Sequence, residues 1–186
     1  QFRQRKGVNL TYISFVVKAV AESLKENPLV NSTWDGDAII LKRRINIGVA
    51  VATPEGLVVP VIHDADRLSI AGLAHALSDL TSRVRDKKLA LADVQGGTFT
   101  LNNTGALGSY LSGPIINYPQ AGILTTETIQ KRPVVIPAES GDAIAIRSMM
   151  NICLAFDHRI NDGSEASGFM SAVKSKLQKM AHGTSI

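Results

Sequence analysis

The spacing of apolar residues switches repeatedly between the period of a helix and that of a strand. Three segments, beginning near residues 11, 70 and 163, carry apolar side chains at helical spacing. Shorter apolar runs lie between them, some alternating with polar or small residues. Helices with one apolar face must cover another layer, so the pattern predicts one α+β domain, a sandwich of helices on a sheet. A chain of 186 residues is long enough for its own core.

The expected helices have recognisable starts and ends. Thr11 can cap the first helix, and Pro28 closes it. The second runs from Ile70 to Val84 and ends in a charged stretch that should lie in solvent. The third follows Gly163, and its apolar face is expected to comprise Ala166, Phe169, Met170, Val173, Leu177 and Met180.

Strands are expected where the apolar period is two or the apolar run is short. Residues 45–52 predict one strand with a single face on the core, and Pro60 suggests an edge or bulge shortly after it. "GGTFTLNN" predicts a short strand, and "AGILTTETI" and "RPVVIPA" two neighbouring ones. The last strand, from Ala143 to Phe156, should bury Ile144, Ile146, Met150, Ile152, Leu154 and Phe156 on one face.

Composition narrows the function classes. Lys plus Arg exceed Asp plus Glu by 20 to 16, and few aromatic residues lie among the basic ones, so no nucleic-acid partner is expected. The single cysteine, Cys153, excludes an internal disulfide framework and is expected in the core. No stretch predicts a membrane span or a secretory signal, so cytoplasm or mitochondrial matrix is expected. The surface histidines His63, His75 and His182 lack a metal-binding motif, and no metal site is predicted.

The stretch "AFDHRINDG", residues 155–163, places ionisable side chains where the last strand ends. His158 is the natural general base there, because an imidazole accepts a proton near neutral pH. Other interpretations are open. A lone histidine is more often structural, Asp162 can simply cap the following helix, and Arg159 with Asp157 can be an ion pair that fixes the turn.

The whole string from Asp157 to Gly163 resembles the active-site signature of the dihydrolipoamide acyltransferases of the 2-oxoacid dehydrogenase complexes. The resemblance covers nearly the whole chain and includes "NPLVNSTWDGD", "INIGVAVATPEGLVVPVI", "GGTFTLNNTGALGS" and "PIINYPQAGIL". It implies the α+β sandwich fold of chloramphenicol acetyltransferase, an enzyme with a similar motif, in which a mixed β-sheet is covered by helices. It also implies that residues 1–186 are a catalytic domain truncated at its N-terminus, with lipoyl and peripheral-subunit-binding domains absent.

The resemblance assigns roles to residues. His158 would take the proton from the thiol of coenzyme A or of dihydrolipoamide, with the lipoyl group carried on a domain absent from this chain. Asn102 stands where the family has a serine or threonine that donates to the oxyanion; alternatively, Asn102 and Asn103 only form the turn at Gly105. Asp162 would support the geometry of the site, and Asp157, Arg159, Gly163 and Gly105 are expected to be structural.

The resemblance further implies a homotrimer with active sites between subunits, assembled into a cubic or dodecahedral core. Its partners would be lipoyl domains, a decarboxylase and dihydrolipoamide dehydrogenase. "NNTGALGS" favours the branched-chain type, while acetyl and succinyl transfer stay open. Two alternatives are a non-catalytic structural core module and an acetyl-CoA-dependent O-acetyltransferase of the same fold.

Overall fold

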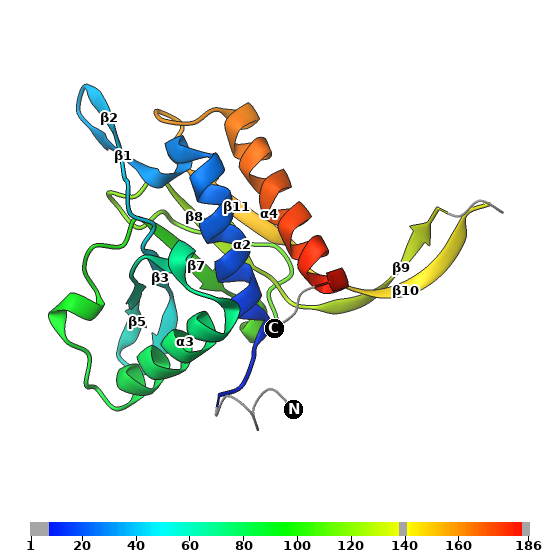
Figure 1. Ribbon diagram of the computed structural model, residues 1–186, viewed down its shortest axis with the longest axis horizontal. Helices are drawn as coiled ribbons and strands as arrows, with labels where there is room; N and C mark the ends of the chain where they lie inside the picture. Colours follow the sequence, from blue (N-terminus) through cyan, green and yellow to red (C-terminus); the bar gives the residue numbers. More distant parts are fainter. Residues whose placement is uncertain (1–7, 138–140, 184–186) are drawn as a thin grey trace.

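A mixed five-stranded sheet covered by helices forms the body of the protein in a computed structural model, which describes residues 8–137 and 141–183 (Figure 1). The strand order is β11-β8-β7-β3-β6. The bounds are β3 Ile47–Val49, β6 Val61–Ile62, β7 Phe99–Asn103, β8 Gly122–Thr126 and β11 Ile152–Phe156. Strand β7 is parallel to β3 and β8, whereas β6 and β11 are antiparallel to their neighbours.

The three expected helices are confirmed as α2 (Tyr12–Glu26), α3 (Ile70–Arg85) and α4 (Gly163–Gly183). Helices α2 and α4 lie side by side over the sheet (Figure 1). Thr11 occupies the N-cap position of α2, but its side chain makes no capping hydrogen bond. Ser69 caps α3, where its Oγ accepts a hydrogen bond from the Gly72 N–H at 3.1 Å.

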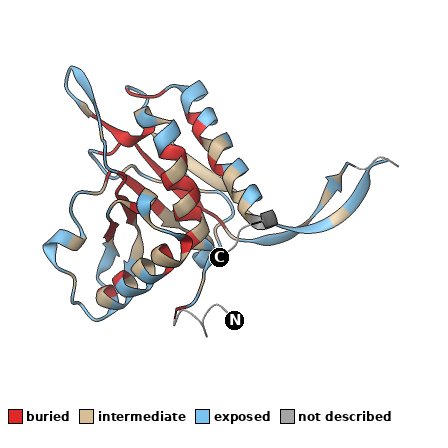
Figure 2. Ribbon diagram, viewed as in Figure 1, coloured by how far each residue is buried: buried red, intermediate tan, exposed pale blue. Residues whose placement is uncertain are grey.

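The core lies between the helices and one face of the sheet (Figure 2). Phe99 of β7 and Phe169 of α4 are fully buried and pack edge to face, with ring centroids 5.6 Å apart. Leu101 and Leu124 continue this face on β7 and β8. The helical faces supply Val16, Val17, Val20, Leu24, Leu73, Leu80 and Val173. The apolar period in the sequence therefore identified the packed face of each helix.

The single strand expected over residues 45–52 is wrong. Strand β3 ends at Val49, and the chain continues as β4 (Val51–Thr53), which pairs with β5 (Gly56–Val58) in a separate hairpin. Asn46, a polar residue within this stretch, is buried, and its side chain bonds Gly96 O and the Asp64 N–H. The edge expected near Pro60 is confirmed, since Pro60 directly precedes the edge strand β6.

The long last strand is also wrong, because it is two strands. Strand β10 (Ala143–Met149) forms a projecting ribbon with β9 (Gln130–Ile136), and β11 begins at Ile152 (Figure 1). Ile144 and Ile146 are 80% and 69% exposed instead of buried. The predicted pairing of "AGILTTETI" with "RPVVIPA" fails too, because β8 lies between β7 and β11. Alternation specifies a strand, but not which chain covers its apolar face.

The remaining elements are short. Strands β1 (Ser32–Asp35) and β2 (Ala38–Leu41) form a further hairpin. Single 3₁₀ turns cover Pro28–Asn31, Ala65–Arg67, Leu91–Asp93 and Gly105–Leu107. Among the residues that the structure describes, no helix combines the length and apolar character needed to cross a bilayer.

Candidate functional site

His158 lies exposed in the turn between β11 and α4. Its ring is 5.4 Å from that of Phe156, the last residue of the strand. The strand end is fixed by the pairing of Phe156 with Gly122 and by the Asp157 N–H, which donates to Ala121 O at 2.8 Å. Within residues 8–137 and 141–183, the imidazole nitrogens make no hydrogen bond, so both are free to meet a substrate.

Asp157 and Arg159 form the ion pair that the sequence suggested. Asp157 Oδ1 accepts from the backbone N–H of Arg159 at 3.0 Å, and the side chains meet as well. This hydrogen bonding holds the pKa of Asp157 below its usual range, against the opposing effect of burial. The guanidinium also lies 5.6 Å from the ring of Trp34. The residues on either side of His158 are therefore held to each other and to β1.

Asp162 caps helix α4. Its Oδ1 accepts from the N–H groups of Ser164 at 2.7 Å and Glu165 at 3.1 Å, and Glu165 Oε2 accepts from the Asp162 N–H at 2.7 Å. This reciprocal capping box fixes the start of the helix. Hydrogen bonding to Glu165 and Ser164 lowers the pKa of Asp162. Gly163 begins α4, and a Cβ there would meet nothing within 4 Å, so space does not require glycine.

Asn102 and Asn103 are half-buried at the end of β7. Asn102 Oδ1 accepts from the Asn103 N–H at 2.8 Å, which leaves the amide Nδ2 of Asn102 as a donor. Asn103 Oδ1 accepts from Tyr12 Oη at 2.9 Å and from the Ala106 N–H at 3.3 Å. Asn103 therefore shapes the turn, while Asn102 keeps a donor for another group.

Gly105, in the turn that follows, is required by close packing. A Cβ at this position would lie 2.3 Å from the carbonyl carbon and oxygen of Glu127. Glu127 itself is fully buried and was missed by the sequence analysis, which treated "AGILTTETI" as an apolar run. An acidic residue inside such a run was the available signal, because a carboxylate is rarely buried without hydrogen-bond partners.

His158 and Asn102 lie toward opposite ends of the sheet. Phe156 pairs with Gly122 at the start of β8, whereas Asn102 pairs with Thr125 near its end. Three residues of a strand span roughly 10 Å, and two strand-to-strand steps add roughly the same distance sideways. The two side chains of one chain are thus too far apart to contact a single reacting atom.

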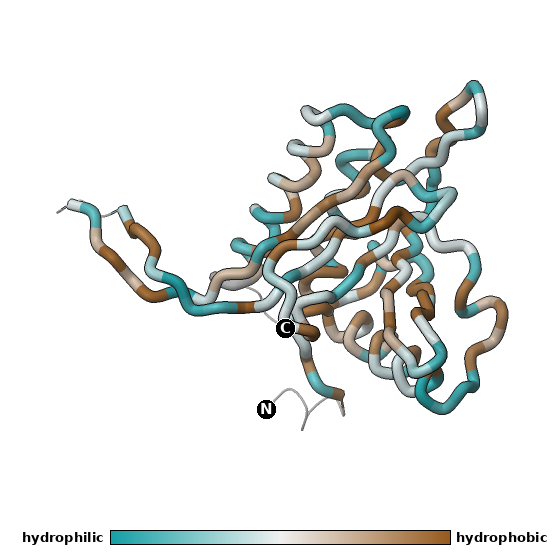
Figure 3. Tube along the Cα trace, turned by 180° about the vertical axis from the view of Figure 1, so that it is seen from behind, coloured by the Kyte–Doolittle hydropathy of each residue, from teal (hydrophilic) through white to brown (hydrophobic). Residues whose placement is uncertain are grey.

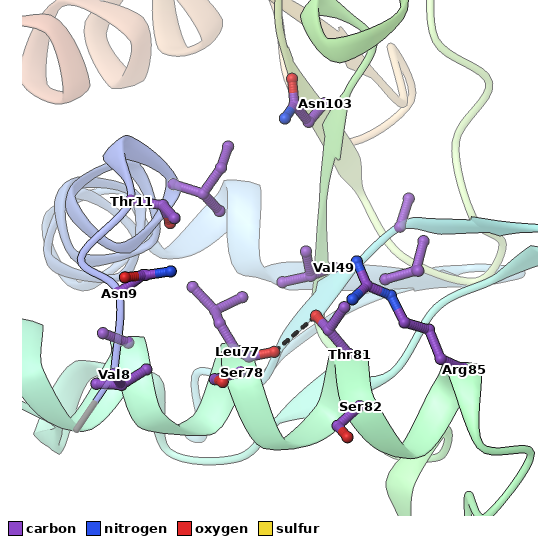
Figure 4. A pocket seen from close by; sticks show the side chains of 14 residues that line it. Val8, Asn9, Thr11, Val49, Leu77, Ser78, Thr81, Ser82, Arg85 and Asn103 are labelled. Atoms are coloured by element: carbon purple, nitrogen blue, oxygen red, sulfur yellow. Dashed lines mark hydrogen bonds between the residues drawn. The ribbon is translucent and has the colours of Figure 1, made fainter. Parts of the chain in front are cut away.

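A pocket of about 630 Å³ opens beside the end of β7 (Figure 4). The start of α2, helix α3 and strands β3 and β4 enclose it, and Asn103 stands on one wall. Arg85 extends its guanidinium toward the strands, and Thr81 Oγ1 donates to Leu77 O at 2.7 Å. A smaller hollow of about 270 Å³ lies between β11 and α4, lined by Leu154, Phe156, Gly163, Ala166, Ser167 and Met170.

Cys153, expected in the core, is instead half-buried on β11. His63 and His75 are exposed as expected, and the His182 side chain lies outside the described residues. In the part of the chain that the structure describes, no group of His, Cys, Asp and Glu side chains is arranged to hold a metal ion.

Comparison with known sequences gives one family. Residues 1–183 match the family described as 2-oxoacid dehydrogenases acyltransferase (catalytic domain). The chain is 51% identical over 185 residues to the lipoamide acyltransferase component of the branched-chain alpha-keto acid dehydrogenase complex of Bacillus subtilis, covering 100% of this chain and 43% of that protein. It is 47% identical over 178 residues to the succinyltransferase component of the 2-oxoglutarate dehydrogenase complex of the same organism, covering 96% and 42%. The chain spans less than half of these relatives.

Comparison with solved structures gives relatives of the same kind. A probable dihydrolipoamide acetyltransferase from Listeria monocytogenes matches with a TM-score of 0.94 and 48% identity, covering 100% of this chain and 77% of that one. Two others match at TM-score 0.89 and 35% identity, covering 96% and 73%. They are the cubic core of the pyruvate dehydrogenase multienzyme complex, and the Azotobacter vinelandii dihydrolipoamide acetyltransferase in which catalytic roles of a serine, a histidine and an asparagine were investigated. Chloramphenicol acetyltransferase, at TM-score 0.60 and 15% identity over 94% of this chain and 80% of its own, confirms the expected fold.

Proposed function

Because the chain belongs to the family of 2-oxoacid dehydrogenase acyltransferase catalytic domains, we propose that it moves an acyl group between the thiols of dihydrolipoamide and coenzyme A. The family match over residues 1–183 is the observation that carries this proposal. The exposed imidazole of His158 supports it. The histidine and asparagine studied in the Azotobacter protein are four positions apart, as are His158 and Asp162.

His158 would act as the general base. A free thiol has a pKa of about 8.5, so at pH 7 it is mostly protonated and a weak nucleophile. The imidazole removes the thiol proton as the sulfur attacks the carbonyl carbon of the acyl thioester. A tetrahedral oxyanion forms, and the amide Nδ2 of Asn102 donates a hydrogen bond to it. The intermediate then expels the other sulfur, which takes the proton, so that one thioester replaces another.

The active site would lie between two copies of the chain. His158 and Asn102 are at opposite ends of the sheet, so the base of one subunit must meet the oxyanion donor of the next. The β9–β10 ribbon carries several hydrophobic residues (Figure 3), and the exposure of Val135, Ile144 and Ile146 supports self-association. Three equivalent copies in a ring would form three such sites, and we infer a homotrimer that assembles further into a cubic or dodecahedral core.

Coenzyme A would enter through the pocket of about 630 Å³ between α2 and α3. The Arg85 guanidinium suits its phosphates, and the apolar walls formed by Ile13 and Leu77 suit its thiol-bearing arm. Asn103 stands at the end of this pocket and directly follows Asn102. A thiol carried along the pocket would thus arrive beside the oxyanion donor.

We further propose that residues 1–186 act within a longer protein whose lipoyl domain delivers the acyl group. The decarboxylase and dihydrolipoamide dehydrogenase components would be its partners, in the cytoplasm, since the B. subtilis and Listeria relatives are bacterial. The branched-chain type is favoured because the B. subtilis protein of that type is 51% identical to this chain, although the succinyltransferase is close at 47%.

The test is acyl transfer from isobutyryl, acetyl and succinyl coenzyme A to free dihydrolipoamide, with oligomeric mass measured on the same samples. We expect trimers or larger assemblies that transfer isobutyryl fastest, and an assembled His158→Ala variant that is nearly inactive. Assemblies without transfer would favour the non-catalytic core module. Acetylation of a hydroxyl acceptor but not of the dithiol would favour the O-acetyltransferase.

A further inference from the structure

Glu127 is an acidic residue buried beside the end of β8. It follows β8 directly and is fully buried, and its N–H donates to Asn151 O at 3.0 Å. No salt bridge involves it among residues 8–137 and 141–183. A buried carboxylate without a cation must be stabilised by hydrogen bonds, or it is costly to the fold.

Hydroxyl groups of the loop that follows β7 supply those hydrogen bonds. Ser112 Oγ donates to Oε1 of Glu127 at 2.6 Å, and Thr104 Oγ1 donates to Oε2 at 2.9 Å. Burial raises the pKa of Glu127. Hydrogen bonds from Ser112, Ser109, Thr104 and Cys153 together lower this pKa by more than burial raises it, so it lies below its usual value. The carboxylate is therefore charged at neutral pH and can accept through both oxygens.

The segment held in this way, residues 104–112, has little apolar anchoring of its own. Leu107 and Leu111 are 82% and 72% exposed. Two hydrogen bonds to main-chain carbonyls of the segment tie it to the same region of the sheet: the Thr128 N–H donates to Ser109 O at 2.8 Å, and the side-chain Nδ2 of Asn151 donates to Tyr110 O at 2.8 Å. Polar contacts around Glu127 thus fix the conformation of the segment.

The segment begins two residues after Asn102, directly beyond the end of β7 at Asn103. Alternate residues of a strand share a face, so Asn102 lies on the side of β7 opposite to Leu101, which faces the core. Thr125, the strand partner of Asn102, is two residues before Glu127. Glu127 directly follows β8, and its hydrogen bond with Thr104 links it to the chain two residues beyond Asn102.

We propose that Glu127 is a positioning residue, which acts through Thr104 and Ser112 to hold the 104–112 segment and thereby the amide of Asn102 in its donating orientation. The inference rests on the proposed acyl transfer. Fixed donors stabilise an oxyanion because no reorganisation is needed during the reaction. Loosening the segment would therefore lower kcat. The coenzyme A pocket would change less, because its wall residue Asn103 bonds Ala106 of the segment but is also held by Tyr12 and Thr126.

The experiment compares Glu127→Ala, Glu127→Gln and Thr104→Val in the assembled full-length protein. The matched control is Glu55→Gln, an exposed carboxylate in the β4–β5 turn that pairs with Lys87. We expect Glu127→Ala to lower kcat by about 10- to 100-fold, the range that misplacement of a catalytic group produces, with the KM for coenzyme A nearly unchanged. Glu127→Gln should recover part of this loss, because its amide still bonds both hydroxyls. Backbone hydrogen exchange across residues 104–112 should speed up in proportion.

Several outcomes would overturn the inference. An assembled Glu127→Ala variant that turns over at the wild-type kcat contradicts the positioning role alone. Faster exchange in the segment with an unchanged kcat does the same. If Glu127→Ala does not assemble, Thr104→Val decides, because it deletes one hydroxyl and keeps the shape of the side chain. A wild-type assembly that transfers no acyl group refutes the proposed function itself, and with it the positioning role.

Discussion

The guanidinium of Arg159 binds the carboxylate of Asp157 through two nitrogen atoms, with Nη2 2.6 Å from Oδ2 and Nε 2.9 Å from Oδ1. The pair therefore bridges over His158, the residue between them. Such a two-point contact fixes both the distance and the orientation of the two groups. The backbone of His158 is held by its neighbours, while its ring stays exposed.

The first prediction concerns acid stability. The folded-state pKa of Asp157 is lowered, chiefly by Arg159, so the stability it contributes is complete above the unfolded pKa and is lost as the pH falls through the folded pKa. Arg159→Met should move this loss to higher pH. Melting temperatures measured from about pH 7 down to about pH 3, the range in which carboxyl groups titrate, would show this shift. Arg147→Met on the exposed ribbon is the control, and parallel curves for the two variants would contradict the prediction.

Asp162 provides a second prediction, because its observed contact is a helix cap. Asp162→Asn should preserve the cap and most of the activity, since asparagine is an equally good capping residue. Asp162→Ala should lower both the melting temperature and kcat, because the N–H groups of Ser164 and Glu165 lose their acceptor. Thermal melts and transfer rates on the same preparations test this. Equal behaviour of the two variants would argue against a capping role.

Asn102 and Asn103 should have separable effects. Asn102→Ala removes the proposed oxyanion donor and should lower kcat by on the order of 100-fold, whereas Asn102→Ser should retain more activity because a hydroxyl also donates. Asn103→Ala should mainly raise the KM for coenzyme A, because Asn103 lines the pocket. Steady-state kinetics on the three variants separate these effects, and a kcat unaffected by Asn102→Ala would assign the residue to the turn.

Mixing inactive subunits tests whether the site is shared. A trimer that combines His158→Ala and Asn102→Ala chains has an intact site wherever the unmodified histidine of one chain meets the unmodified asparagine of the next. Random equal mixing after unfolding and reassembly should restore about a quarter of the wild-type sites in a cyclic trimer. The two variants reassembled separately are the controls. No recovery in the mixture would contradict a site that is shared between subunits.

The sequence predicted the helices well because each one packs against its own chain. Leu24, Leu73 and Phe169 each belong to the helically spaced apolar residues of one helix, and all three are buried. The strands were less predictable. Nothing local distinguishes Ile144, which is 80% exposed on the ribbon, from Leu154, which packs against the core, since both belong to alternating apolar runs. Which of the two is covered depends on tertiary and quaternary contacts.

The candidate site was recognised from a motif, but its supporting contacts were not. The local sequence predicted the Asp157–Arg159 ion pair and the helix cap by Asp162, because the partners in each contact are only two or three positions apart. Glu127 was missed because its partners, Thr104 and Ser112, are 23 and 15 positions away. The opposite placement of His158 and Asn102 likewise follows from the antiparallel pairing of β11 with β8, which no short stretch of sequence encodes.

The projecting β9–β10 ribbon has a consequence for the life of a newly made subunit. In a subunit that has not yet joined the proposed assembly, Val135, Ile144 and Ile146 face water on a two-stranded ribbon, and such surfaces attract other unassembled chains. Correct association then competes kinetically with aggregation, and its rate rises with the local concentration of folded subunits. Translation of many copies from one mRNA would favour assembly, whereas strong dilution would favour dissociated subunits with an exposed ribbon.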